Sequence, residues 1–294
     1  MSKPMNIQPK YQDIIKRLDK GYSIIKTMRP LPTDGVQYFM NEFSISTTHS
    51  SNAIEGNTFT YDETKLLIEK GITSNVHSYR EHADIMGYKQ GFDFLYKALK
   101  NGNKIDEEFI KKLHSYVMQG EDRAGEYRTI QNYVGDLVRV VYTPCAPNDV
   151  PSKMNDYIKG LSDDLEKYSN AARASEVKWN ELFQNLAKHH IEFERIHPFA
   201  DGNGRTGRLL LTYEIISMGL LPVDIRYEER KRYYAALAAY DDKAKYSTRS
   251  ESKTEKMAKL LAESELRSVD LWIKTFSNYV SEDLVKSEIN QDDK

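Results

Sequence analysis

Cysteine is almost absent from this sequence, which contains a single one, Cys145, among 294 residues. A lone cysteine cannot form a disulfide within the chain, and it leaves no second thiol for a metal cluster. This scarcity argues against a disulfide-stapled extracellular scaffold and against a cysteine-ligated zinc module, and it predicts a reducing compartment. We expect Cys145 to be a small, unreactive side chain.

Long hydrophobic runs and an excess of one charge are also lacking. No run of about eighteen apolar residues occurs, and the first residues, MSKPMNIQPK, lack the apolar stretch of a signal peptide. The 42 Lys and Arg residues nearly balance the 44 Asp and Glu residues, which leaves a formal charge of -2. The composition therefore predicts a cytoplasmic protein with no membrane anchor and no nucleic-acid-binding face, so any anion must be bound locally.

Helical patterns dominate the chain, and 39% apolar residues are enough to bury a full core. Apolar residues recur every three or four positions from Ile14 to Ile25 and from Val36 to Phe43. Capping pairs begin two further helices, Thr60 with Glu63 and Ser78 with Glu81. The predicted later helices span about 61–70, 79–100, 106–118, 176–196 and 205–218, and two or three more close the chain, the last at about 269–279.

One segment is typical of strands. The stretch YRTIQNYVGDLVRVVYTP is rich in Val, Ile and Tyr around a central Gly-Asp, which predicts a β-hairpin. We therefore expect an all-α protein with a single β-hairpin. We divide it into an N-terminal helical region (1–100), a central core (101–245) and a C-terminal helical extension (246–294).

Residues 197–208, HPFADGNGRTGR, combine an imidazole, a carboxylate, turn-forming residues and two guanidinium groups. They join two predicted helices, so the glycines lie at a helix N-terminus, where free N–H groups bind phosphate. Arg205 and Arg208 are one helical turn apart and can reach successive phosphates. Asp201 supplies an oxygen ligand for Mg²⁺, and His197 can act as a general base. Together these groups indicate phosphoryl or nucleotidyl transfer.

Taken alone, D-G-N-G could be only a tight turn, with Asp201 as a helix N-cap. The whole stretch, however, resembles the signature of the Fic family, H-x-F-x-D/E-G-N-G-R-x-x-R. Every defined position is met, by His197, Phe199, Asp201, Gly202, Asn203, Gly204, Arg205 and Arg208. The resemblance covers roughly residues 31–245 and implies a Fic-like helical bundle with a hairpin flap.

The resemblance implies transfer of AMP from ATP to a Tyr, Ser or Thr hydroxyl of a target protein. His197 would deprotonate this hydroxyl, Asp201 would hold Mg²⁺ between the α- and β-phosphates, and Phe199 would pack the loop. Arg205 would take the β-phosphate and Arg208 the γ-phosphate, and Asn203 would help to orient the phosphates. The implied nucleotide-binding segment is Asp201, Gly202, Asn203, Gly204, Arg205, Thr206, Gly207 and Arg208.

A second matching stretch, THSSNAIEGN, lies far upstream. Alone, Glu55 and Gly56 would simply end a helix. Beside a Fic signature, Ser51 and Glu55 match the S/T-x-x-x-E-G/N pattern of an inhibitory helix. Glu55 would then pair with Arg208 and compete with the γ-phosphate, so that ATP could bind only in a pose unsuited to in-line attack.

Three weaker features complete the expected site. The hairpin, with Val134 and Gly135, is either a surface element or a flap that holds the target by strand addition and covers the nucleotide. Tyr233 and Tyr234 are either core aromatics or the lining of an adenine pocket. His189 and His190 could suggest a metal site with His197, but no third ligand has a suitable spacing, so a packed helical face is favoured.

Two other functions stay open. One is a Fic-fold enzyme that moves another phosphate-containing group, and the other is a non-catalytic nucleotide-binding regulator. The intact pair Arg205 and Arg208 favours ATP in the AMP-transferring pose, and the near-neutral charge argues against nucleic acid. The resemblance leaves the balance between AMP addition and removal open. It implies ATP, Mg²⁺ and a protein target as partners, and related proteins often form homodimers.

Overall fold

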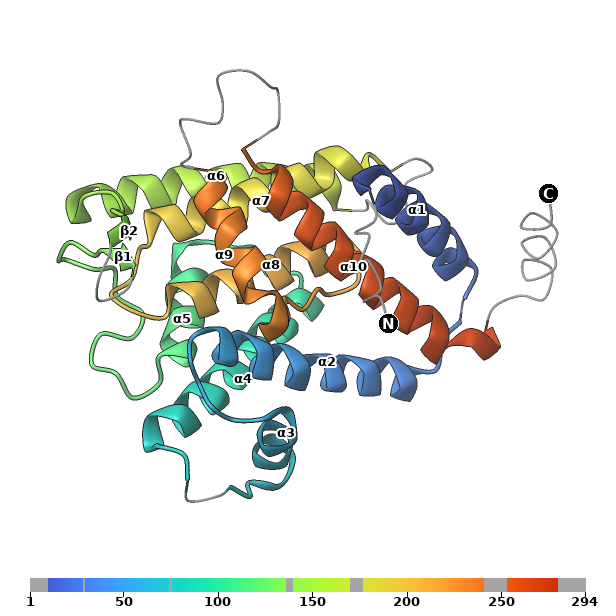
Figure 1. Cartoon of the computed structure of the whole chain (residues 1–294), viewed down its shortest axis with the longest axis horizontal. Helices are drawn as coiled ribbons and strands as arrows, with labels where there is room; N and C mark the ends of the chain where they lie inside the picture. Colours follow the sequence, from blue (N-terminus) through green and yellow to red (C-terminus); the bar gives the residue numbers. More distant parts are fainter. Residues whose placement is uncertain are drawn as a thin grey trace, which may run out of the picture.

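A computed structural model gives the structure of the chain. It describes residues 10–28, 30–73, 76–135, 140–169, 177–240 and 253–279. The helices in these ranges are α1 (Tyr11–Thr27), α2 (Thr33–Ile54), α3 (Tyr61–Lys70), α4 (Tyr79–Lys100), α5 (Glu107–Val117), α6 (Val150–Tyr168), α7 (Trp179–Ile196), α8 (Asn203–Ser217), α9 (Arg230–Ala239) and α10 (Glu255–Thr275). The expected all-α class with one hairpin is confirmed (Figure 1).

The predicted capping signals act as expected. Thr60 and Ser78 each form a capping box with the glutamate three residues later, and Gly71 ends α3 in the left-handed conformation at φ 65°. Helix α6 was not predicted, although a proline in its first turn and a buried apolar stripe that includes Val150 and Leu161 are typical helix signals. The prediction for 269–279 was wrong at its start, because α10 already begins at Glu255.

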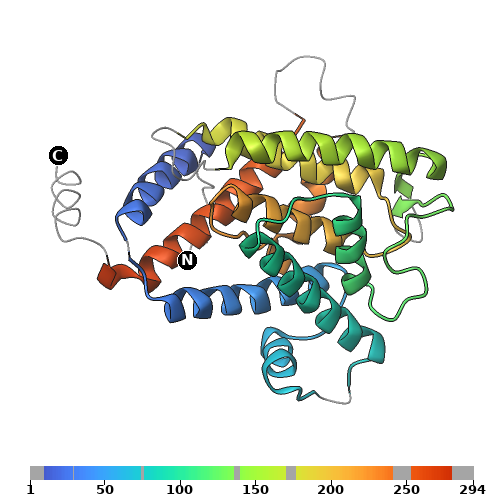
Figure 2. The ribbon, with the colours of Figure 1, turned by 180° about the vertical axis from the view of Figure 1, so that it is seen from behind.

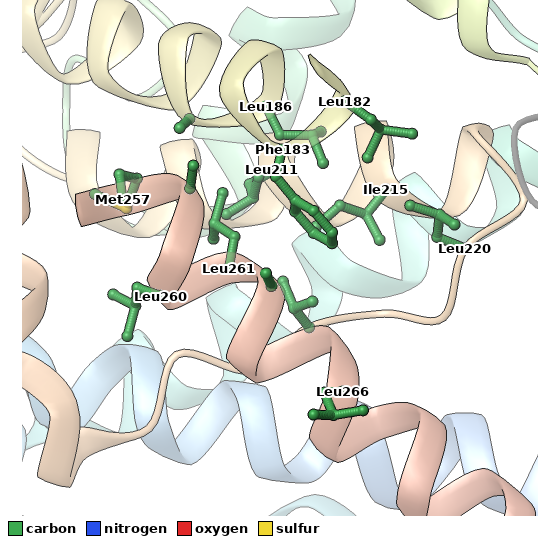
Figure 3. Packing of buried hydrophobic residues seen from close by; sticks show 14 of the residues in the cluster. Leu182, Phe183, Leu186, Leu211, Ile215, Leu220, Met257, Leu260, Leu261 and Leu266 are labelled. Atoms are coloured by element: carbon green, nitrogen blue, oxygen red, sulfur yellow. The ribbon is translucent and has the colours of Figure 1, made fainter. Parts of the chain in front are cut away.

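Two hydrophobic cores meet at α8. In the first core α8 packs with α7 and α10, and α1 packs with α10; in the second, α8 packs with α4 and α5. Figure 3 shows Leu211 and Ile215 of α8 among side chains of α7 and α10, while Leu209 and Leu210 belong to the other core. Helix α8 is therefore buried on nearly every side, which fixes the position of its N-terminus, where the motif lies.

The hairpin lies beside the C-terminal end of α7, at the edge of the bundle that also carries the N-terminus of α8 (Figures 1 and 2). Strand β1 (Val134–Gly135) pairs antiparallel with β2 (Val140–Tyr142). Residues 136–139, which include half of the VGDL stretch, lie outside the described residues. Among the described helices, none combines the length and the hydrophobicity needed to cross a membrane.

Candidate active site

His197 ends α7 in an unusual backbone conformation. Its φ is 50°, and among the described residues it is the sole non-glycine residue with a positive φ. Such a conformation costs on the order of 1–3 kcal/mol and persists only where the surroundings enforce it. The buried Arg128 supplies that constraint, because its guanidinium donates to the carbonyl oxygens of His197 at 2.8 Å and Ile196 at 3.3 Å.

The hydrogen bonds of His197 define which ring nitrogen can act. Its Nδ1–H lies 3.2 Å from the carbonyl oxygen of Glu194, which accepts this proton. The Nε2 nitrogen is thereby left as the acceptor. Burial lowers the pKa of His197, so the imidazole is neutral at neutral pH. A neutral imidazole with a free Nε2 has the form that a general base requires.

The loop after His197 is braced from within. Phe199 is fully buried and stacks on the ring of His114 with a centroid distance of 3.6 Å, which confirms its expected packing role. The Asn203 side chain accepts from the Phe199 N–H and donates to the Phe199 carbonyl, both at 2.9 Å. The side-chain amide of Asn203 is therefore occupied by hydrogen bonds within the loop. Of the groups of Asn203, its backbone N–H is the one left to orient the phosphates.

His114 is a supporting residue that sequence reasoning missed. Its Nε2–H donates to the carbonyl oxygen of Asp201 at 3.0 Å, while its Nδ1 accepts from the Gly125 N–H at 2.8 Å. Burial lowers the pKa of His114 to about 4, so this ring stays neutral and holds the loop without a charge. The signal that could have found it is its position on the buried face of the amphipathic α5.

The two glycines at the start of α8 are required by their surroundings. Gly202 has φ 71°, and a Cβ there would clash with the Met118 side chain. A Cβ at Gly204 would collide with the carboxylate of Glu55. The free N–H groups at this helix N-terminus form an anion site, and Glu55 brings a carboxylate to it.

The expected contact between Glu55 and Arg208 is present. Arg208 Nη2 lies 2.6 Å from Glu55 Oε1, and the same guanidinium donates to Ser51 Oγ at 2.8 Å and to the Ser51 carbonyl at 3.0 Å. The Arg208 side chain is only 5% exposed. Burial opposes its charge, but the nearby Glu55 carboxylate raises the pKa of Arg208. Glu55 is also the C-cap of α2, so it both ends a helix and binds the motif.

Asp201 and Arg205 have partners on α4 that the sequence did not predict. Asp201 Oδ1 accepts from the Gly202 N–H at 2.6 Å, and its Oδ2 accepts from Arg80 Nη2 at 3.1 Å. Arg205 is nearly buried and forms an ion pair with Asp84. A single exposed carboxylate suits Mg²⁺, which is held by one or two protein carboxylates together with substrate phosphates. The described residues contain no cluster of three or more metal-ligating side chains.

A pocket of about 540 Å³ brings together four parts of the predicted site: Glu55, strand β1, the 197–208 motif and the tyrosine pair. Its lining includes Glu55, Val134, Gly135, Tyr142, Ile191, Glu194, Arg195, His197, Gly204, Arg208, Tyr233, Tyr234, Leu237 and Ala238. Tyr233 is buried and its hydroxyl lies 2.8 Å from Nε2 of His190, whereas the half-exposed Tyr234 donates to the carbonyl of Ile54 at 3.2 Å. Strand β1, the tyrosine pair and the carboxylate of Glu55 thus line the same pocket as His197.

Other predicted residues lie outside this pocket. Thr206 is fully buried, and Gly207 packs against the side chains of Phe193 and Glu194. His189 does not face His197, because it lies between the carboxylates of Asp164, at 3.1 Å, and Glu214, at 3.0 Å. The favoured reading of His189 as a packed helix residue is therefore confirmed.

Glu194 is a pocket residue that sequence reasoning missed. Its Oε1 is buried without a hydrogen-bond partner, and burial raises the pKa of Glu194 to about 7. The nearby positive charge of Arg208 opposes this rise, and the carboxylate of Glu55 adds to it. The lining of the pocket therefore contains a second carboxyl group beside that of Glu55.

Comparisons with known proteins agree with this geometry. Residues 104–215 match the model of the Fic/DOC family. Protein adenylyltransferase fic-1 of Caenorhabditis elegans is 33% identical over 193 residues, which are 63% of this chain and 34% of the relative. The fic-1 protein of Caenorhabditis briggsae is 29% identical over 248 residues, which are 80% of this chain and 45% of the relative. The chain thus spans less than half the length of these curated relatives.

Two solved structures share the fold. A Fic domain containing signaling protein from Bacteroides thetaiotaomicron has a TM-score of 0.78 at 24% identity, covering 90% of this chain and 99% of that one. Fic-1 (residues 134–508) from C. elegans has a TM-score of 0.71 at 25% identity, covering 91% of this chain and 74% of that one. These two structures show the fold, and the family model assigns residues 104–215 of this chain to the Fic/DOC family.

Proposed function

We propose that this protein transfers AMP from ATP to a hydroxyl group of a target protein. The observation that carries the proposal is the shared pocket, in which His197 lies with Arg208, Gly204, β1 and the tyrosine pair. Each of these parts suits one portion of the reactants: the polyphosphate, the adenine or the target backbone. The relatives named protein adenylyltransferase support the same activity.

In the proposed reaction His197 acts on the attacking hydroxyl. Its Nε2 accepts the hydroxyl proton while the oxygen attacks the α-phosphorus, the bond to the β-phosphate oxygen breaks, and pyrophosphate leaves. Arg208 and the N–H groups at the start of α8 bind the phosphates and stabilise the negative charge that develops. Asp201 would hold Mg²⁺, which neutralises charge on the leaving group when bound.

The target segment is proposed to bind along the flap. Strand β1 is a short edge whose residues line the pocket beside His197. An extended peptide that pairs with such an edge presents alternate side chains to one face. One of these side chains would thereby reach the imidazole. Tyr, Ser and Thr are the candidates, because their hydroxyl groups are the nucleophiles that a neutral imidazole can activate.

Glu55 is proposed to inhibit this reaction within the same chain. It takes the guanidinium that the γ-phosphate would need, and its carboxylate lies where a Cβ of Gly204 would be, close to the phosphate-binding turn. A triphosphate entering this pocket meets a negative charge at its γ end. By resemblance to the family, the pocket is also a candidate for removing AMP from a modified target.

The experiment that tests the activity uses ATP labelled at the α- or γ-phosphate, followed by measurement of intact mass. AMP transfer labels the protein from α-labelled ATP alone and adds the mass of one AMP. Label from γ-labelled ATP would instead indicate phosphate transfer, and nucleotide binding without labelling in both the wild type and Glu55→Gly would indicate a regulator. His197→Ala is the matched control, because it removes the base but no phosphate-binding group.

A homodimer is a further proposal, and exposed apolar side chains support it. The exposed fractions of Leu66 on α3, Ile72 and Val76 on the connection, and Tyr79 at the start of α4 run from 43% to 88%. We name these four residues the α3 patch. Several large exposed apolar side chains in one short segment are typical of a protein interface. In Figure 1 this segment projects from the lower edge of the molecule, which leaves it accessible to a second copy.

A further inference from the structure

Four charged residues form a closed ring between α4 and the motif loop. Arg80 Nη2 lies 3.1 Å from Asp201 Oδ2, and Arg80 Nε lies 3.3 Å from Asp84 Oδ1. Asp84 pairs with Arg205, and Arg205 Nη2 lies 4.0 Å from Asp201 Oδ1. We name these residues the charge ring. Arg80 and Asp84 are one turn apart on α4, and they face Asp201 of the motif loop and Arg205 in the first turn of α8.

The charge ring engages the two motif residues that the proposed function assigns to metal and phosphate. The Oδ2 of Asp201 accepts a hydrogen bond from Arg80, and the guanidinium of Arg205 donates one to Asp84. The other phosphate-binding arginine, Arg208, is engaged separately by Glu55. The site in this state therefore has two independent sets of internal ion pairs, one from α2 and one from α4.

The two contacts across the ring differ in burial. The side chains of Arg205 and Asp84 are 5% and 18% exposed, whereas those of Arg80 and Asp201 are 44% and 65% exposed. Breaking a buried pair leaves charges without solvent and is costly, whereas an exposed pair contributes little to stability. The contact between Arg80 and Asp201 is therefore the one that opens readily.

Arg80 also has a third partner, which lies outside the charge ring. Its Nη1 forms an ion pair with Glu121, which lies after α5, and its Nε stays near Asp84. When Arg80 leaves Asp201 it thus keeps two carboxylates beside it. The movement that frees Asp201 requires only a change of partner at one end of the guanidinium, with no uncompensated charge left behind.

We propose that Arg80 competes with the metal for Asp201, holding this carboxylate before nucleotide binds and ceding it to Mg²⁺ when nucleotide arrives. The inference rests on the proposed function, which places the metal at Asp201. A divalent cation and a guanidinium on the same carboxylate repel one another, so each weakens the binding of the other. Arg80 is in this sense a positioning residue that acts through Asp201.

The test measures Mn²⁺ binding to the protein with ADP by electron paramagnetic resonance. ADP is used because it lacks the γ-phosphate with which Glu55 would compete. In Arg80→Gln we expect Mn²⁺ to bind about two- to fivefold more tightly, which is the range that an exposed ion pair allows. In Glu121→Gln we expect weaker binding, because Arg80 loses its alternative partner and stays on Asp201. The opposite signs distinguish this competition from a general loss of charge.

Arg123→Gln is the matched control. Arg123 is also 44% exposed, and it pairs with Glu126 outside the charge ring. It should leave Mn²⁺ affinity nearly unchanged, whereas Arg80→Lys should restore most of the wild-type affinity. Adding Asp201→Asn should remove the gain seen in Arg80→Gln, because the carboxylate at issue is then absent.

Two results would overturn the inference, and they separate it from the proposed function. If Mn²⁺ binding depends on Asp201 but Arg80→Gln leaves it unchanged or weakens it, Arg80 does not compete and instead binds phosphate or is passive. The proposed function would survive that result. If neither wild type nor Arg80→Gln binds Mn²⁺ through Asp201, the metal role of Asp201 fails as well.

Discussion

At the scale of single residues, the protonation of His197 has a measurable consequence. Burial lowers the pKa of this imidazole, and its Nδ1–H is held by the Glu194 carbonyl, so the base stays neutral to a lower pH than an ordinary histidine. We expect the acid limb of the pH–rate profile for AMP transfer to lie below about pH 6.5, the unperturbed value. An acid limb above that pH would contradict the assignment.

The same residue is tested by substitution. His197→Ala should abolish transfer, with a loss of at least about 100-fold, while ADP binding measured by calorimetry stays close to the wild-type value. The reason is that the imidazole moves a proton but holds no phosphate. Arg128→Ala is an informative companion, because it removes the hydrogen bonds that keep His197 in the left-handed turn. It should lower the rate and the melting temperature together.

The motif could be identified from the sequence because its polar and glycine residues lie within twelve consecutive positions, and its catalytic role stays a prediction. Arg80 and Asp84 could not, since each is separated by 121 positions from its motif partner. On a helix they resemble an ordinary surface pair at i and i+4, and no local pattern distinguishes the two cases. His114 was hidden in another way, because a histidine on the buried face of an amphipathic helix is usually part of the core.

At the scale of elements, α2 carries the contact proposed to be regulatory, because its C-cap Glu55 pairs with Arg208. Replacing Glu55 with Gly should free Arg208 and increase AMP transfer about 5- to 150-fold, the range of a typical coupling free energy between two sites. The reason is that the carboxylate no longer competes with the γ-phosphate for the guanidinium. Labelling from α-labelled ATP under matched conditions would measure the increase.

Glu55→Gln separates charge from flexibility in this test. It keeps the size of the side chain but removes the negative charge that pairs with Arg208, so it should also raise transfer. In the double variant with His197→Ala the increase should vanish. If Glu55 only ends α2, both variants would leave transfer unchanged or lower it through modest destabilisation, and the inhibitory role would be lost while the catalytic one remains.

The helices were more predictable than their order in space. Capping boxes fixed the starts of α3 and α4 within the chain, because both partners of each cap are three residues apart. The central position of α8 could not be derived, because a helix buried on nearly all sides has no polar face to indicate its orientation. The proposed division at residues 100 and 245 stays a prediction.

At the scale of the whole molecule, a buried carboxyl group links stability to pH. Glu265 of α10 is fully buried, and its Oε1 accepts hydrogen bonds from the hydroxyl of Tyr22 in α1 and from the Leu221 N–H. Burial raises the pKa of Glu265 to about 8. The folded state therefore favours the protonated form, so this contribution to stability is complete below about pH 4.5 and is lost as pH rises towards 8.

Glu265→Gln tests this linkage. The variant cannot ionise, so its melting temperature should change less than that of the wild type between about pH 5 and 8. The melting temperature of the variant should increase relative to that of the wild type as pH rises, whatever the difference between them at low pH. Equal slopes for the two proteins, followed by circular dichroism, would show that Glu265 does not titrate in this interval.

The α3 patch leads to a prediction about assembly. Tyr79 is 88% exposed and follows the Ser78 N-cap directly, so replacing it with Asp changes the surface without touching the core. If the patch joins two copies, Tyr79→Asp should shift the protein from dimer to monomer in analytical ultracentrifugation. Lys100→Asp, at the other end of α4, is the control and should leave the mass unchanged. A wild-type protein that is monomeric at all concentrations would refute the homodimer.

Glu55 occupies an electrostatically unfavourable position in its own helix. The carbonyl groups at the C-terminus of α2 carry partial negative charge, the last turn contains no basic residue, and the C-cap adds a full negative charge. This end of α2 is thus locally frustrated, and the cation of Arg208 offsets that cost. A polyphosphate that draws Arg208 away would therefore loosen the helix end at the same moment as it displaces Glu55, so that ligand entry and unwinding of the last turn favour each other.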